Sequence, residues 1–263
     1  RKLMFANDLN ALLQTFPPQD REQILGHITV YDDLLAQLPR VDQQPPETSQ
    51  RDFGILALNG ASGAGQSYVM ARVQRLLDTQ SMTLPRIYLL ATRAPRPGEG
   101  HKDPYIFVEE VEDVPEGYRD IHHPEVVYKP EDIYYFYPSR PGAANAILLE
   151  DARAALEDVR YLETVIPTLL HIKTTRIDDI PAWGDNLQIL YLAAPSGVEW
   201  VYRLLNREPA KLEDEAFRAK LLGRLSSSID DMRLAAEHEI ACVLNRHGEA
   251  ERAAQDILTG WGL

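Results

Sequence analysis

Apolar residues follow two patterns along this chain. Short continuous apolar runs are typical of buried strands, and longer stretches with an apolar residue every three or four positions are typical of amphipathic helices. The runs predict strands at residues 53–59, 85–91, 159–166, 189–193 and 240–244, and strand-like alternation covers 104–109 and 132–137. The recurrence predicts helices at 3–15, 20–38, 68–77, 143–158, 212–239 and 249–259. Together they predict an α/β fold with a parallel sheet covered by helices on both faces.

The first 50 residues differ from the rest of the chain. Their two amphipathic helical patterns are separated by Phe16-Pro17-Pro18, and a polar, turn-rich stretch at 39–52 follows them. Such a stretch is typical of a linker. We therefore expect a helical N-terminal extension and linker at 1–50 and a main domain at 51–263. Two roles stay open for the extension, a protein-binding or dimerising element and a packed addition to the main domain.

Composition limits the classes of function. The chain has 263 residues with 44% hydrophobic content, enough to bury a large core, and a net charge of −13 that opposes binding to nucleic acid or to an anionic membrane. No apolar run approaches the roughly 18 residues that cross a bilayer, and no signal-like segment follows Arg1, so we expect a cytoplasmic protein. The single cysteine, Cys242, excludes an internal disulfide and lies in an apolar run as a core residue.

The strongest chemical signal is the stretch from Gly60 to Ser67, which follows a predicted strand and precedes a predicted helix. Its glycines let the backbone curl with N–H groups pointing inward, and the helix N-terminus adds a partial positive charge. The spacing is that of the phosphate-binding loop G-x-x-x-x-G-K-[ST], with Gln66 in place of the lysine. We expect a phosphate site; the alternative is an ordinary glycine-rich turn.

A second cationic element follows the predicted strand at 85–91. Arg93 and Arg96 stand three residues apart among prolines, which suits paired guanidinium donors to phosphate, and Tyr105 lies nine residues further on. The alternative is a set of surface charges beside acids such as Glu99.

These pieces, in this order, resemble the guanylate kinase family of nucleoside monophosphate kinases over about residues 53–260. Gly60–Ser67 is similar to the family's Gly-x-Ser-Gly-x-Gly-Lys-Ser except at Gln66, and Thr92–Glu99 matches Thr-Arg-x-Pro-Arg-x-Gly-Glu. Tyr105-Ile106-Phe107, Pro195-Ser196 and Arg203–Arg207 match later motifs. The resemblance implies a three-layer P-loop NTPase fold with a parallel sheet, an acceptor subdomain at about 92–140 and a lid at about 207–224.

The resemblance also implies site residues. ATP would be bound by Gly60, Ser62, Gly63, Ala64, Gly65, Gln66, Ser67 and Tyr68, with Mg²⁺ on Ser67. The acceptor phosphate would be held by Arg93, Arg96 and Tyr105. The nucleobase would contact Tyr137, Ser139 and Glu163, with Glu125 or Glu131 as a second acid. Catalytic positions would be Gln66, Arg207 and Arg224, with Arg218 competing for the place of Arg224.

Departures from the family leave two functions open. Leu89 replaces a serine that binds the acceptor phosphate in the family, Pro138 interrupts a Tyr-Gly-Ser motif, and Gln66 removes a charge. One function is ATP-dependent phosphoryl transfer to a nucleoside monophosphate such as GMP or another small phosphorylated acceptor. The other is a catalytically weak or inactive guanylate kinase-like module that binds a nucleotide or a protein.

Two further patterns receive structural interpretations. His122-His123 resembles a metal pair, but neighbours in an extended segment point to opposite sides and no third ligand is spaced to join them, so we expect no metal there. The alternating tyrosines Tyr134, Tyr135 and Tyr137 are expected to build core and one wall of a cleft.

Overall fold

The computed structural model describes residues 2–43, 55–82, 88–102, 105–112, 117–140, 142–151, 161–164 and 187–263. Its named helices are α1 (Lys2–Leu13), α2 (Pro18–Leu35), α3 (Gln66–Thr79), α7 (Gly197–Leu205), α8 (Glu215–Glu237) and α9 (Ala250–Trp261), with 3-10 turns η1 (Pro130–Asp132) and η3 (Pro209–Lys211). Its strands are β1 (Ile55–Gly60), β2 (Leu90–Ala91), β3 (Ile106–Glu110), β4 (Tyr118–Asp120), β5 (Val127–Tyr128), β6 (Ile133–Arg140), β7 (Ala143–Leu148), β8 (Tyr161–Thr164), β9 (Leu187–Ala193) and β10 (Cys242–Leu244).

The first sheet has the strand order β10-β9-β1-β8, and all its pairs are parallel. Successive side chains of a strand point to opposite faces, so Leu190 and Leu192 pack with α3 and α9, while Tyr191 and Ala193 pack with α2, α7 and α8. Both faces are therefore buried under helices, which is the environment that parallel strands require. The predicted mixed α/β fold with a parallel sheet is confirmed.

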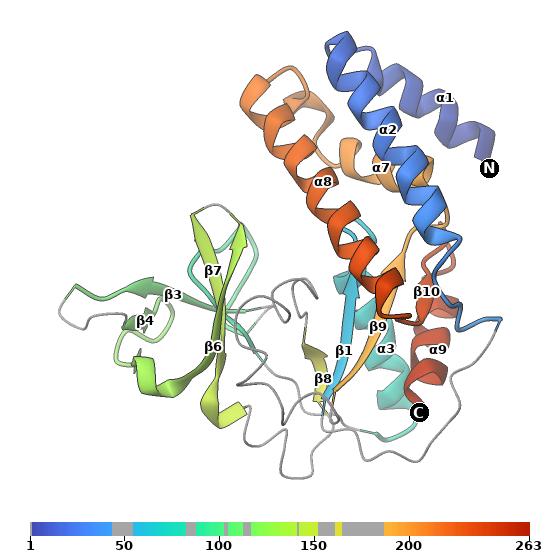
Figure 1. Cartoon of the computed structure of the whole chain (residues 1–263). Helices are drawn as coiled ribbons and strands as arrows, with labels where there is room; N and C mark the ends of the chain where they lie inside the picture. The colour runs from blue at the N-terminus through green and yellow to red at the C-terminus, as the bar shows by residue number, and fades with distance from the viewer. Residues whose placement is uncertain are drawn as a thin grey trace.

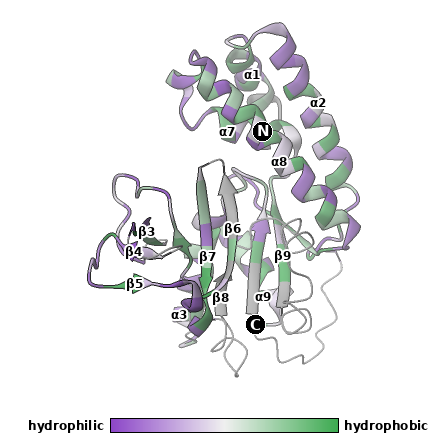
Figure 2. Cartoon of the chain, turned by 60° about the vertical axis from the view of Figure 1, so that its left-hand side comes forward, coloured by the Kyte–Doolittle hydropathy of each residue, from purple (hydrophilic) through white to green (hydrophobic). Residues whose placement is uncertain are grey.

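The two N-terminal helices are part of the larger core. Pro18 and Asp20 suit the first turn of α2, and Ile24, Ile28 and Tyr31 recur on one face that packs against α7 and α8. Hydrophilic and hydrophobic residues alternate around this helix in Figure 2. The extension packs on the main domain in this structure, and the boundary expected near residue 50 lies outside the described residues.

The second sheet lies beside the first (Figure 1) and has the order β5-β4-β3-β2-β7-β6. Its pairs are antiparallel except β2 with β3. A small core of Leu90, Ile106, Val108, Tyr118 and Ala146 supports it. This sheet carries the segment expected to bind the acceptor. In the described part of the chain, no helix combines the length and apolar character needed to cross a membrane.

One predicted helix is wrong. Residues 143–148 of the expected helix 143–158 form β7, which pairs antiparallel with β2 and β6. The alanine-rich sequence favours a helix by less than about 1 kcal/mol per residue, and pairing with two strands outweighs that preference. Gly142, with φ of 71°, turns the chain from β6 into β7. Residues 149–151 are helical, and 152–160 lie outside the described residues.

Candidate functional site

The loop between β1 and α3 leaves the start of a helix without a side-chain cap. β1 ends at Gly60 and α3 begins at Gln66, and the N-cap residue Gly65 is left-handed with φ of 93°. A Cβ atom at Gly65 would lie 2.6 Å from Nδ2 of Asn245, so a larger residue would displace Asn245 and would also be strained by the positive φ. Uncapped first-turn N–H groups and the helix dipole together make a site for an anion.

Contacts from distant elements hold the loop in shape. The Ser62 N–H donates to Oγ of Ser228 on α8 at 3.0 Å, and the Ser62 carbonyl accepts from Nε1 of Trp200 on α7 at 2.9 Å. Trp200 in turn stacks on Tyr31 of α2, with ring centroids 4.5 Å apart. The loop geometry therefore depends on α7 and α8 and, through Trp200, on the N-terminal helix α2.

Two more side chains, Arg203 and Asn245, converge on the Ala64 carbonyl. Asn245 Nδ2 donates to this oxygen at 2.7 Å and Arg203 at 3.4 Å. Arg203 also donates to the Asn245 carbonyl at 2.7 Å and to Glu199 at 2.6 Å. No role was predicted from the sequence for Arg203 or Asn245. The i,i+4 spacing of Glu199 and Arg203 was a usable signal for their helical pair, whereas nothing local indicated the role of Asn245.

Gln66 turns its side chain back onto the loop. Its Nε2 donates to the Gly60 carbonyl at 3.3 Å, which bridges the first and last residues of the turn. Ser67 and Tyr68 follow it in the first turn of α3 and are exposed. The start of α3 thus presents an exposed serine, Ser67, beside the neutral amide of Gln66.

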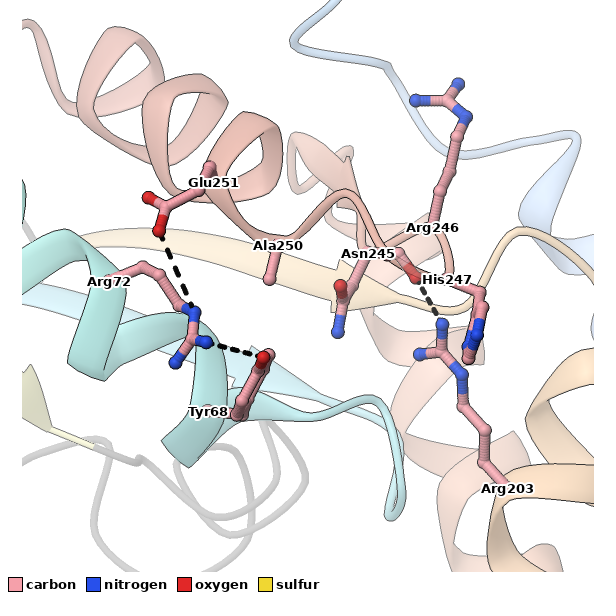
Figure 3. A pocket seen from close by; sticks show the side chains of 9 residues that line it. Tyr68, Arg72, Arg203, Asn245, Arg246, His247, Ala250 and Glu251 are labelled. Carbon is pink, nitrogen blue, oxygen red and sulfur yellow. Dashed lines mark hydrogen bonds and ion pairs between the residues drawn. The ribbon is translucent and has the colours of Figure 1, made fainter.

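A pocket of about 460 Å³ opens beside the loop (Figure 3). Its lining includes Tyr68, Arg72, Arg203, Asn245, Arg246 and His247. The Arg72 guanidinium lies 3.5 Å from the Tyr68 ring centroid and 4.0 Å from the Glu251 carboxylate. Arg246 points away from the other side chains in Figure 3, toward Asp42 at 3.4 Å. The pocket therefore offers a planar aromatic and cationic surface next to the uncapped helix.

The expected acceptor arginine Arg93 is already paired within its own loop. Its guanidinium donates to both Glu99 carboxylate oxygens, at 2.6 and 2.7 Å, and lies over the rings of Phe107 and Tyr105 at 4.9 and 5.3 Å. The Arg93 hydrogen bond lowers the pKa of Glu99, because it stabilises the charged carboxylate. An acceptor phosphate would have to compete with Glu99 for this guanidinium. Arg96 is exposed.

The other expected acceptor residues are placed only in part. Leu89, at the position of the family's serine, is buried. Tyr137 and Ser139 lie in β6 and Glu163 lies in β8, but their side chains fall outside the description. Glu125 and Glu131 are exposed near β5 and η1.

The expected lid segment is packed against the core in this structure. Leu212 and Leu221 are buried among the helices of the larger core, and α8 continues unbroken through Arg224. Arg218, the competitor, donates to the carbonyls of Leu212 and Glu213. Arg207 is exposed beyond the end of α7.

Comparison with known proteins assigns no family. No protein-family model matches the sequence, and no curated protein matches it. Among solved structures, a guanylate kinase from Anaplasma phagocytophilum has a TM-score of 0.43 and 14% sequence identity, over 77% of this chain and 81% of that chain. This similarity is too low to carry a function, so the proposal below rests on the residues of this chain.

The expectation that His122 has no further ligand partner is wrong. Tertiary structure brings His101 and Asp120 to it, and ligand atoms of the three residues lie within 4.8 Å of one another. Asp120 ends β4 and His122 follows it closely, whereas His101 lies in the turn before β3, so only the pairing of β3 with β4 brings His101 to the other two.

Proposed function

We propose that the loop from Gly60 to Ser67 binds the phosphates of ATP with Mg²⁺, and that the chain transfers the γ-phosphoryl group to a nucleoside monophosphate such as GMP. The observation that carries this proposal is the start of α3 behind a left-handed Gly65, where no side chain caps the first-turn N–H groups and an anion could accept from them. The proposal includes the three-layer P-loop NTPase fold of the guanylate kinase type.

The residues of the site fit a magnesium nucleotide. The Ser67 hydroxyl is exposed in the first helical turn, where it can be one oxygen ligand of Mg²⁺ while phosphates and water supply the others. The pocket beside the loop would hold the nucleoside, with the Tyr68 ring and the Arg72 guanidinium as its planar wall. Bound Mg²⁺ would supply charge neutralisation for the phosphates.

Phosphoryl transfer at this site should be slow. Charge stabilisation by a positioned donor is the main contribution to phosphoryl transfer, and loss of one such donor costs roughly a hundred- to a thousandfold in rate. Gln66 carries no charge and is bonded to Gly60, while Arg93 is paired with Glu99. Arg207 and Arg224 are the cations that we propose to stabilise the transition state.

The alternative function is a guanylate kinase-like module that binds nucleotide or protein without transferring phosphate. The bond from Gln66 to the Gly60 carbonyl favours this alternative, because the loop then stabilises itself without a phosphate-directed cation. A module that binds nucleotide shares ATP binding at the loop with the kinase and differs from it in turnover, whereas a module that binds only protein lacks both.

A charge-restoring variant distinguishes them. ADP release by the wild type, Gln66→Lys and Gln74→Lys is measured in a coupled assay across a panel of nucleoside monophosphates, and ATP binding is measured by calorimetry. Gln74 lies on the exposed side of α3, where it bonds Asp78, so its variant adds the same charge away from the loop. We expect Gln66→Lys to raise the turnover number by about a hundredfold or more and Gln74→Lys to leave it unchanged.

Three other outcomes have distinct meanings. ATP binding without turnover of any acceptor in either lysine variant would favour the binding module. Equal activation by both lysine variants would show that general charge, and not the loop position, limits the rate. Absence of ATP binding in the wild type and in Gln66→Lys would refute the proposal altogether.

A further inference from the structure

A cluster of metal-binding side chains lies at the end of β4, away from the phosphate loop in sequence. His101 lies in the turn before β3, Asp120 is the last residue of β4, and His122 lies in the bend that follows. One ligand atom from each lies within 4.8 Å of the other two. Two imidazoles and one carboxylate are therefore brought together by the antiparallel pairing of β3 with β4.

The carboxylate of this cluster is oriented by the backbone. Asp120 is only 1% exposed, and its Oδ1 accepts the N–H groups of His122 at 2.8 Å and His123 at 3.1 Å. Its other oxygen, Oδ2, is 3.4 Å from Nδ1 of His101. Hydrogen bonds to one oxygen thus hold the second one toward the histidine, as outer contacts orient the ligands of metal sites.

The histidine nitrogen that Asp120 faces is without a hydrogen-bond partner. Nδ1 of His101 is buried, and none of the described residues forms a hydrogen bond with it. Buried polar atoms are almost always paired in folded proteins, so this nitrogen is available to a bound ion or ligand. A neutral imidazole nitrogen beside a carboxylate oxygen is a pair of atoms that a divalent metal ion would satisfy at once.

We propose that His101, Asp120 and His122 bind one divalent transition-metal ion, with Zn²⁺ as the ion that suits them best. Zinc accepts two histidine nitrogens and one carboxylate oxygen at about 2.0–2.2 Å and keeps a fourth position for water or a ligand. His122 is exposed, so its ring can rotate toward Nδ1 of His101 and Oδ2 of Asp120. Mg²⁺ and Ca²⁺ prefer oxygen ligands, so a site with two imidazole nitrogens disfavours them.

His123 is not counted among the ligands. Its ring centroid lies 4.4 Å from that of His101, but its Nδ1 is directed to the Glu125 carboxylate at 3.6 Å. The fourth position of the ion is therefore assigned to solvent.

A bound ion would be connected to Arg93 through Phe107. The Ile121 N–H next to His122 donates to the Phe107 carbonyl at 2.9 Å, and the Phe107 ring lies 6.1 Å from the His122 ring and 4.9 Å from the Arg93 guanidinium. A metal at the cluster would hold two turns of this sheet together and fix the aromatic support under Arg93. The site stands apart from ATP binding and does not depend on the proposed function.

The test is a zinc titration of the purified full chain after treatment with a chelator. Binding is followed by competition with a chromophoric chelator, and Co²⁺ is then added to record the visible absorption that a low-symmetry nitrogen and oxygen site produces. The variants are His101→Ala and His122→Ala, with His238→Ala as the control for an exposed histidine at the end of α8. Circular dichroism without metal checks that each variant is folded.

We expect one equivalent of Zn²⁺ in the wild type and in His238→Ala, and affinity at least about a hundredfold lower in His101→Ala and in His122→Ala. The Co²⁺ absorption should disappear in the same two variants. No Zn²⁺ binding by the wild type would overturn the proposal and leave the 3.4 Å contact of His101 with Asp120 as a pair without a metal. Binding that survives in both cluster variants, or that falls equally in His238→Ala, would also overturn it, because the ion would then sit on scattered surface histidines.

Discussion

Asp231 on α8 should make the chain less stable as the pH rises. Burial, together with the neighbouring charge of Asp230, raises the pKa of Asp231 to about 7 from an ordinary value of 3.8. The pKa of Tyr191 is also raised, chiefly by burial, then by Tyr31 and then by the charge of Asp231, so Asp231 lies near Tyr191. At a pH between 3.8 and about 7, Asp231 is therefore protonated in the folded chain and ionised in the unfolded chain.

The magnitude follows from the difference between the two pKa values. The folded-state value lies about 3 above the ordinary one, and each pKa unit corresponds to about 1.4 kcal/mol, so the ionised carboxyl costs the folded state about 4 kcal/mol above pH 7. Below about pH 4 both states hold the proton and the cost vanishes. Stability from this group is therefore lost progressively from about pH 4 to pH 7.

The assay compares the wild type with Asp231→Asn in urea unfolding followed by circular dichroism, at pH 5 and at pH 8. The asparagine does not ionise, so the variant should gain about 3 kcal/mol relative to the wild type between these two pH values. Asp230→Asn is the control for the neighbouring charge, because Asp230 is exposed, bonds Arg233 at 2.7 Å and raises the pKa of Asp231 less than burial does. It should change the pH dependence only slightly. If Asp231→Asn and the wild type lose stability in parallel, Asp231 ionises freely in the folded chain and the reasoning is refuted.

Three other substitutions, the first with a control, test the site. Gly65→Ala adds a side chain to a left-handed residue, so it should lower the free energy of unfolding by about 1–2 kcal/mol and weaken ATP binding in calorimetry. Gly223→Ala is the control: its methyl group on α8 would lie in open space, so the free energy of unfolding should rise by up to about 1 kcal/mol. Trp200→Phe leaves the Ser62 carbonyl without its donor and should lower the free energy of unfolding by about 1–3 kcal/mol; an unchanged urea midpoint would contradict this. Arg93→Lys removes the paired donors and should raise the Michaelis constant for the acceptor about tenfold without changing ATP binding; an equal rise for ATP would mean that Arg93 does not contact the acceptor.

Features with local causes could be predicted from the sequence. Gly60, Gly65 and Ser67 stand between an apolar run and a helical pattern, and the strand, turn and helix follow because each depends on neighbouring residues. The strands at β1, β9 and β10 and the helices α2, α8 and α9 were predicted to within a few residues for the same reason. The loop as a phosphate site remains a proposal, since only a ligand can test it.

Features that depend on distant residues were decided by tertiary structure. Residues 143–148 have the composition of a helix, and pairing with β2 and β6 makes them a strand. Asn245 reaches the Ala64 carbonyl because β10 and β1 both pair with β9. His101 meets Asp120 because β3 and β4 bring two turns together. Such pairs are separated by many residues along the chain, and hydropathy reports only whether a residue is buried, whereas the fold determines which residues are buried together.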